Sequence, residues 1–368
     1  MRTFSHPGYK RFLLSVGCLL SIHFTALFFL TLFRLVFFFS ANYDFPDQEH
    51  VGFMSIWPAF IRGVWFDNVI ACYILLIPLV AVSISALFNY YGKILWNVTC
   101  IFFSLFYRIV LLVTAANIPY FQYFFKIINS SVFNWFGYMN TTAGMVFGET
   151  SYYPPLIGFL LTLVLFIWLM RRLIRHFQRL LNTKNPSVFW LDRIYIFLTA
   201  GICIGLCLFG IRGRTGYNPI KVSAAYYCTD PFLNQLGISP VFNLLSSTLD
   251  DSRKENRYLH LMPENEALEN TRHYLNRPGI EGISPIARQI NASDSLRRPN
   301  IVLIFMESMS AHLMKRFGQQ KELTPFLDSL YRQSLAFSNF YSSGIHTNHG
   351  MYATLYSFPS ILKRNAMK

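Results

Sequence analysis

A short polar stretch near the C-terminal end of the sequence carries the residue types that could do chemistry. Residues 342–350 read Ser-Ser-Gly-Ile-His-Thr-Asn-His-Gly, which puts the hydroxyl of Thr347 between His346 and His349. A helix is predicted over 351–356, so Thr347 stands close to a helix start, where free backbone N–H groups and the helix dipole favour an anion such as phosphate. Thr347 is therefore a candidate nucleophile, and an ordinary polar loop is the alternative interpretation.

Glu307 is the second candidate, because it ends an apolar run. Residues 300–306 read Asn-Ile-Val-Leu-Ile-Phe-Met, which is typical of a strand buried on both faces of a parallel sheet. Ligands of open α/β sheets bind outside the carboxyl ends of the strands. A carboxylate at this point is well placed for a metal or a substrate, and a metal held by Glu307 could also bind the hydroxyl of Thr347 and make it a nucleophile toward phosphorus.

The elements between these two candidates follow a strand, helix, strand order. Thr324 and Pro325 supply an N-cap and a proline at the first helical position, which predicts a helix to about residue 334. Residues 335–341 then read as a second strand. The three elements form a βαβ unit, which we expect to be right-handed. Further upstream, 264–274 is the best helical stretch, between Pro263 and Pro278.

Composition points to a membrane. Of the 368 residues, 53% are hydrophobic and only 14% are charged, which is too apolar for an ordinary soluble protein of this size. The net charge of +14 could suggest a nucleic-acid partner, but many of the basic residues flank long apolar runs rather than forming a soluble basic surface. We therefore expect a membrane protein and no nucleic-acid partner.

Five apolar runs are long enough to cross a bilayer, which takes about 20 residues in a helix. Residues 1–211 are accordingly predicted to be a transmembrane domain, followed by a linker over 212–298, in which 212–249 is a loop, and by a further domain over 299–368. The first run is too long for a signal-peptide core, so we expect it to stay attached. The five runs cover residues 12–39, 66–88, 94–116, 154–170 and 194–211.

The positions of Lys and Arg predict the orientation, because short positive segments stay on the cytoplasmic side. The N-terminus and the loop over 171–193 are basic, whereas the loop after the first run is acidic. We expect a cytoplasmic N-terminus and, after five crossings, an extracytoplasmic C-terminal part in a multi-pass protein of the cell (inner) membrane. The residues concerned are Arg2, Lys10, Arg11, Arg171, Arg172, Arg175, Arg179 and Lys184 on the basic side, and Asp44, Asp47 and Glu49 on the acidic side.

Two arginines, Arg34 and Arg108, fall within or near the apolar runs. An unpaired charge in the bilayer is costly, so such residues either snorkel to the headgroups, pair within the bundle or serve a function. We expect snorkelling or pairing, with Asp67 as a possible partner. A role at a lipid headgroup is the alternative.

Four stretches of the C-terminal part resemble the lipoteichoic acid synthase and phosphoglycerol transferase family of the alkaline phosphatase/sulfatase superfamily. Their order and spacing are similar to the start of that family's catalytic domain, and five N-terminal spans with an outer linker are similar to it too. The stretches are Asn-Ile-Val-Leu-Ile-Phe-Met-Glu-Ser over 300–308, Leu-Thr-Pro-Phe-Leu-Asp-Ser over 323–329, Phe-Ser-Asn-Phe-Tyr over 337–341 and Gly-Ile-His-Thr-Asn-His-Gly over 344–350.

This resemblance implies a fold, a reaction and a set of residue roles. The fold is a polytopic α-helical membrane domain followed by the start of an α/β sulfatase-like domain. Glu307 becomes a ligand of a divalent metal, commonly manganese, and Thr347 becomes both nucleophile and metal ligand. The reaction moves a phosphoglycerol-type headgroup from a membrane phospholipid to a glycan, glycolipid or lipid acceptor through a phospho-threonine intermediate.

Two departures from the family leave alternatives open. Where many relatives have an arginine beside the nucleophile, this chain has His346 and His349, which are candidates for substrate binding or simply fill the loop. A phosphoethanolamine transferase, a phosphodiesterase or sulfatase-type hydrolase, and a non-enzymatic sensor or transporter remain alternatives. The family's other metal ligands, an Asp-His pair and a further His, lie well downstream of the nucleophile, so we expect the chain that ends at Lys368 to be a truncated, inactive fragment.

Overall fold

The computed structural model describes residues 6–41, 53–148, 150–181, 190–253, 261–276, 300–306, 309–337, 339–344 and 347–357. The chain divides into two compact units, Met1–Asn256 and Arg257–Lys368. The boundary between the units falls within the segment 212–298 that the sequence suggests as a linker. Each unit is described by itself below.

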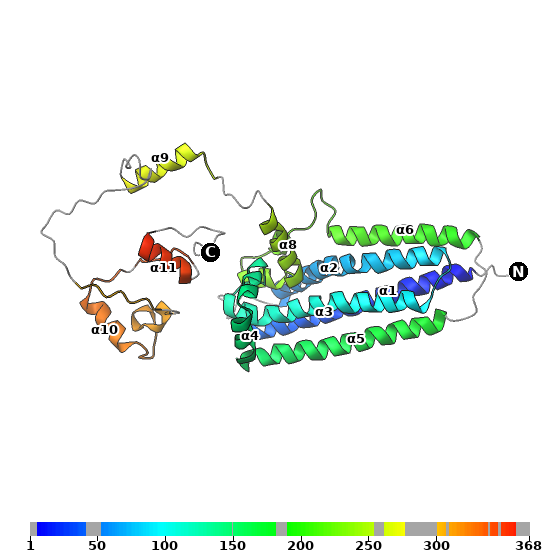
Figure 1. Cartoon of the computed structure of the whole chain (residues 1–368), viewed down its shortest axis with the longest axis horizontal. Coiled ribbons are helices and arrows are strands. Elements are labelled where there is room, and N and C mark those ends of the chain that lie inside the picture. Colours follow the sequence, from blue (N-terminus) through cyan, green and yellow to red (C-terminus); the bar gives the residue numbers. More distant parts are fainter. Residues whose placement is uncertain are drawn as a thin grey trace. The chain divides into compact units, whose positions relative to one another are not determined.

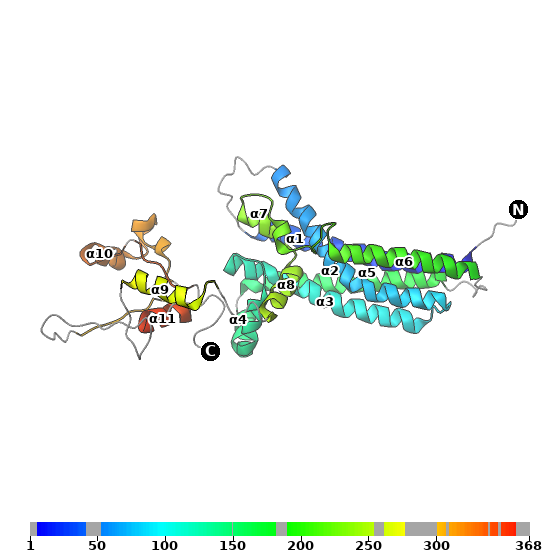
Figure 2. The same ribbon diagram turned by 90° about the horizontal axis from the view of Figure 1, so that it is seen from above.

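Five long helices make up most of the first unit and run side by side in both views (Figure 1, Figure 2). Each of them is long and apolar enough to cross a membrane, which confirms the five runs found in the sequence. A helix satisfies its own backbone hydrogen bonds, as the interior of a bilayer requires. The five helices are α1 (Pro7–Ser40), α2 (Phe53–Leu87), α3 (Lys93–Phe124), α5 (Tyr153–Leu181) and α6 (Trp190–Arg212).

All five helices extend beyond the apolar runs that predict them. The largest difference is in α2, which begins at Phe53 rather than at residue 66, and α5 continues through the basic residues to Leu181 rather than ending at 170. Hydropathy marks only the part of a helix that lies in hydrocarbon. The helical backbone continues into the flanking residues, even past Pro58 in α2, so the predicted start of α2 was too late and the predicted end of α5 was too early.

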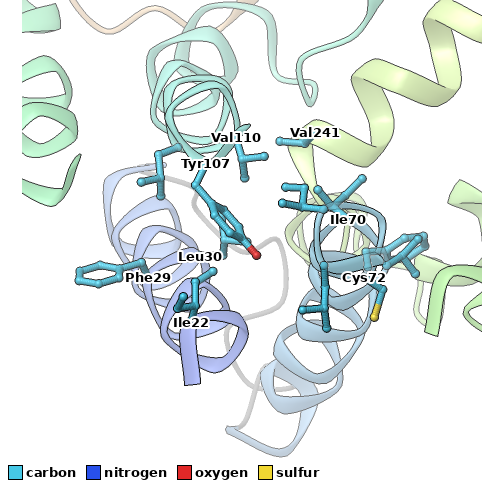
Figure 3. Packing of buried hydrophobic residues seen from close by; sticks show 14 of the residues in the cluster. Ile22, Phe29, Leu30, Ile70, Cys72, Tyr107, Val110 and Val241 are labelled. Atoms are coloured by element: carbon cyan, nitrogen blue, oxygen red, sulfur yellow. The ribbon is translucent and has the colours of Figure 1, made fainter. Parts of the chain in front are cut away.

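The core of this unit is formed where the helices meet. α1 packs against α2, α5, α6 and α3, while α2 also packs against α6, and α3 against α5. Tyr107 of α3 is almost fully buried, and its ring lies 5.1 Å from that of Phe166 on α5. Figure 3 shows the ring of Tyr107 pointing from α3 toward the space between Leu30 of α1 and Ile70 of α2. Aromatic rings therefore join several helices at one level of the bundle.

Short helices cover one end of the bundle, where the sequence analysis predicted only a loop over 212–249. Helix α7 begins after Asp230, whose carboxylate Oδ1 accepts the backbone N–H of Leu233 at 2.8 Å, and α8 begins after Ser239. Both have proline at the first position, so Asp-Pro and Ser-Pro are start signals that the loop prediction overlooked. The elements at this end are η1 (Ser130–Tyr138), α4 (Met139–Gly148), η2 (Thr150–Tyr152), η3 (Val222–Ala225), α7 (Pro231–Leu236) and α8 (Pro240–Ser252).

The segment that contains η3 is fastened to the first turns of α2. The guanidinium of Arg62 lies over the ring of Tyr227, 4.5 Å from its centroid, and its Nε donates to the carbonyl of Ala224 at 3.1 Å. The hydroxyl of Tyr227 donates to the carbonyl of Ser55 at 2.6 Å. Burial raises the pKa of Tyr227 to about 12, so the phenol stays protonated and keeps this hydrogen bond at any physiological pH.

Arg34 and Asp67 form a buried ion pair between α1 and α2, which confirms Asp67 as the partner. The distance from Arg34 Nη2 to Asp67 Oδ2 is 2.6 Å, and the two side chains are 4% and 2% exposed. Nη1 of the same guanidinium donates to the carbonyl of Leu236 and, at 3.1 Å, to that of Ile238. One side chain therefore connects α1, α2 and the end of α7.

Gly63 of α2 makes room for this guanidinium. A Cβ atom at residue 63 would overlap Cζ, Nε and Nη1 of Arg34. Any larger residue at this position would push the arginine away from its three oxygen acceptors. The pairing of Arg34 with Asp67 thus depends on a glycine that the sequence pattern alone does not single out.

Arg108 behaves differently from Arg34, although both lie in apolar runs. It is exposed on the surface of α3, near the middle of the helix.

At the opposite end of the bundle from α7, the carboxylate of the buried Asp192 contacts His6 at 2.8 Å and the backbone N–H of Gly8 at 3.3 Å. That pair fixes the start of α1 to the start of α6.

The second unit contains α9 (Glu264–Leu275), η5 (Ala311–Leu313), η6 (Lys315–Phe317), α10 (Pro325–Gln333) and α11 (Thr347–Tyr356). The two helices predicted over 264–274 and 325–334 are confirmed almost to the residue. The predicted strands over 300–306 and 335–341 are not formed in the residues described, and Ile301 and Val302 are 85% and 83% exposed. A strand exists only when a neighbouring backbone pairs with it, and neither described segment has such a neighbour.

Replacing Asp67 by Asn is expected to destabilise the first unit strongly. The buried charge of Arg34 would lose its carboxylate, and breaking a buried ion pair from one side costs about 3–5 kcal/mol. Thermal unfolding of the purified protein in detergent, followed by circular dichroism, measures the effect as a lower Tm.

Arg253→Gln is the matched control for this measurement. The Arg253–Asp250 pair spans 3.5 Å, but both side chains are more than half exposed, so its loss should cost less than about 1 kcal/mol. Equal shifts of Tm in the two variants would show that the Arg34–Asp67 pair does not stabilise the bundle.

Candidate functional site

The polar stretch singled out in the sequence lies at the start of α11. Thr347 is the first residue of this helix and is exposed. The helix therefore starts four residues earlier than the sequence predicted, and the hydroxyl stands at its N-terminal end. The first backbone N–H groups of the helix and the positive end of its dipole lie there, and such a place favours a phosphate or another anion.

The second candidate in this helix, His349, is half-buried in the same first turn. Side chains two positions apart in a helix point in nearly opposite directions, so Thr347 and His349 do not face each other across a common site. His349 as a substrate ligand stays a prediction. Its carbonyl oxygen lies 3.5 Å from the hydroxyl of Ser343, a contact that links the turn of α11 to the preceding loop.

The loop before α11 is held by its own serines. The hydroxyl of Ser342 donates to the carbonyl of Gly344 at 2.6 Å, and its oxygen lies 3.4 Å from the backbone nitrogen of the same glycine. Such side-chain to backbone contacts are typical of tight polar loops. They give the chain a defined turn just before the stretch that carries Thr347.

Two of the four predicted site residues, Glu307 and His346, lie outside the residues that the structure describes. Among the described residues, no group of three or more His, Cys, Asp or Glu side chains gathers at distances that would hold a metal ion. Thr347 is thus the one proposed metal ligand that the structure describes. The metal site proposed at Glu307 and Thr347 stays a prediction.

In the sequence between Glu307 and Thr347, residues 310–333 form a small cluster of local contacts. The carboxylate of Asp328 lies 3.1 Å from the hydroxyl of Thr324 and 3.3 Å from the backbone N–H of Lys315. Arg316 stacks over the ring of Tyr331 at 4.4 Å. Thr324 occupies the N-cap position, but its hydroxyl contacts the carboxylate of Asp328 instead of a backbone N–H, which sequence reasoning did not anticipate.

Comparison with known proteins gives one match. Searches of curated proteins and of solved structures found no relative of this chain. The family model described as Sulfatase matches residues 299–367, a stretch that contains Glu307, α10 and Thr347. The chain therefore combines five helices that are long and apolar enough to cross a membrane with the start of a sulfatase region at residues 299–367.

Proposed function

We propose that the protein is a membrane-anchored, metal-dependent transferase that moves a phosphoglycerol-type headgroup from a phospholipid to an acceptor. The observation that carries this proposal is the position of Thr347, a hydroxyl at the N-terminal end of α11 within the stretch that matches the sulfatase family model. The five apolar helices support a substrate that resides in the membrane. The acceptor is a glycan, a glycolipid or a lipid that carries a free hydroxyl.

The proposed chemistry has two steps. The Oγ1 atom of Thr347 attacks the phosphorus of the donor, the bond from phosphorus to the diacylglycerol oxygen breaks, and that oxygen takes up a proton to leave as diacylglycerol. The acceptor hydroxyl then attacks the phospho-threonine and restores Thr347, which regains the proton that it lost in the first step. The N–H groups at the start of α11 favour the phosphate charge in both steps.

A divalent metal such as manganese, held by Glu307 and Thr347, would stabilise the threonine alkoxide and neutralise the charge on the phosphate. The backbone N–H groups at the start of α11 would also stabilise the negative charge of the phosphate. A phosphoethanolamine headgroup would follow the same two steps. With water as the acceptor the same site would be a hydrolase, although a threonine cannot be converted to the formylglycine that sulfatases use.

Thr347→Ala is expected to abolish headgroup transfer, because the alanine offers no oxygen to the phosphorus. Loss of a nucleophile reduces turnover by about 1,000-fold or more. The measurement follows a phosphatidylglycerol donor labelled in its headgroup and the release of diacylglycerol, with the complete gene product in membranes.

Thr354→Ala is the control on the same helix. The hydroxyl of Thr354 donates to the carbonyl of Gly350 at 2.8 Å, two turns away from the helix start, so transfer should be unchanged. Thr347→Ser should keep part of the activity, because it keeps the hydroxyl. Undiminished transfer by Thr347→Ala would remove this residue from the mechanism, and label found as free phosphoglycerol in place of an acceptor product would show a hydrolase.

Removal of divalent metal by EDTA is expected to stop transfer, and added Mn²⁺ is expected to restore it. In a Glu307→Gln variant, restoration should require at least tenfold more Mn²⁺, because a carboxylate is a far better ligand for this ion than an amide. Activity that survives exhaustive chelation would contradict metal dependence. Restoration of Glu307→Gln at the wild-type Mn²⁺ concentration would contradict the role of Glu307 alone.

The distribution of basic residues predicts the orientation of the five helices. An alkaline phosphatase reporter fused near Lys254 should be active, because it folds only outside the cytoplasm. The same reporter in the loop 182–189 should be inactive, and green fluorescent protein should give the opposite pattern at both places. Phosphatase activity in the loop and not near Lys254 would reverse the topology and exclude an outer-leaflet donor.

A further inference from the structure

An open cavity of about 250 Å³ with both polar and apolar walls belongs to the first unit, at the end of the bundle that α7 and α8 cover. Its lining comes from the segment that follows α3, from η3 and the residues after it, and from α7 and α8. The polar groups among the lining residues are Lys126, Asn129, Tyr226, Gln235 and Asn243. Pockets for drug-sized ligands measure roughly 300–1,000 Å³, so this one suits a small polar group rather than an oligosaccharide.

Hydrogen bonds fix the walls of the cavity in place. The side-chain amide of Gln235 forms two hydrogen bonds with the backbone that follows α3. Its Oε1 accepts the N–H of Ile127 at 3.0 Å, and its Nε2 donates to the carbonyl of Phe125 at 3.2 Å. The Nδ2 atom of Asn243 donates to the carbonyl of Ile128 at 2.9 Å. Because these bonds hold the backbone around Lys126, the cavity is formed before any ligand arrives, which reduces the entropy lost on binding.

The charge in this cavity is positive. Lys126 is the single cationic residue of its lining, and none of the lining residues that the structure describes is acidic. Two carboxylates of neighbouring segments have hydrogen bonds of their own: Asp230 caps α7 at the N–H of Leu233, and Asp251 accepts the hydroxyl of Ser130. Within the described residues, the one contact of the Lys126 ammonium is the ring of Phe124, 5.8 Å away. The ammonium has no anionic partner there.

The length of α3 would place the cavity at the depth of the lipid headgroups when this helix crosses a bilayer. The 32 residues of α3 extend about 48 Å, slightly more than the roughly 40–45 Å of a bilayer with its headgroups. Lys126 follows the end of α3 by two residues. Large exposed aromatic side chains surround this end of the bundle, as is typical of the membrane–water interface, among them Tyr123, Phe125, Phe136 and Phe147.

We propose that this cavity binds the phosphate of a phospholipid headgroup, with the ammonium of Lys126 as the charge partner and with amide groups of its walls as hydrogen-bond donors. Lysine near the membrane surface attracts anionic lipid headgroups, and this cavity lies directly after the end of α3. The proposed lipid site lies in the first unit, whereas Thr347 belongs to the second unit. The site would therefore hold an anionic lipid whether or not the chain transfers headgroups. If the transferase proposal holds, the site retains donor lipid at the protein.

The test is direct binding of phosphatidylglycerol that carries a fluorophore on one acyl chain, measured by anisotropy with the purified protein in detergent. The parent protein and every variant in this test carry Thr347→Ala, so the labelled lipid is not consumed during the measurement. The result therefore does not depend on whether the transferase proposal is correct. Lys126→Gln is expected to raise the Kd about tenfold, equivalent to about 1.4 kcal/mol, and Lys126→Arg to keep it within about threefold. Asn129→Asp, which places a carboxylate in the wall, should weaken binding as much as Lys126→Gln.

Lys221→Gln is the matched control, because Lys221 is exposed at the same end of the chain's first unit but does not line the cavity. Its Kd should equal that of the parent protein. Equal weakening by Lys221→Gln and Lys126→Gln would mean diffuse surface attraction and would overturn the site, as would no effect of Lys126→Gln. Equally tight binding of labelled diacylglycerol, or displacement by inorganic phosphate at the concentration at which unlabelled lipid displaces the probe, would exclude a phospholipid headgroup as the ligand.

Discussion

The buried ion pair of Arg34 and Asp67 is the interaction on which the packing of the first unit depends. Two ions are removed from water, and the cost of burying them is lowered because Nη1 of the guanidinium also finds two backbone acceptors. Those acceptors are the carbonyls of Leu236 and Ile238, in a segment more than two hundred residues away along the chain. The need to satisfy one arginine therefore fixes the position of the chain that leaves α6 and returns over the end of the bundle.

This constraint reaches the cavity around Lys126. Ile238, whose carbonyl accepts from Arg34, also lines the cavity, and so does Gln235 in the preceding turn of α7. Gln235 in turn holds the backbone on either side of Lys126. The ion pair inside the bundle and the cavity at its end share one short helix, so the shape of the cavity depends on a contact made deeper in the bundle.

The region around Thr347 has a different physical basis. Its hydroxyl is placed by a single helix start, and the loop before it is held by local serine contacts. Local structure of this kind needs no distant partner, whereas a metal site needs ligands that converge from several segments. Among the described residues of the second unit, the two apolar segments that would form strands are exposed. The helix N-terminus is in place, and the sheet that would align it with Glu307 is not formed by these residues.

The sequence by itself determined the five apolar helices, the helices that begin at Glu264 and Pro325, and the position of Thr347 near a helix start, because each depends on local composition or on a cap. It also suggested Asp67 as a partner of Arg34, since a charge in hydrocarbon must be paired. Only the tertiary structure decided that Gly63 leaves space for that arginine, that the carbonyls of Leu236 and Ile238 accept from its Nη1, and that Lys126 faces a cavity. These are contacts between residues distant in sequence, and no local pattern encodes them.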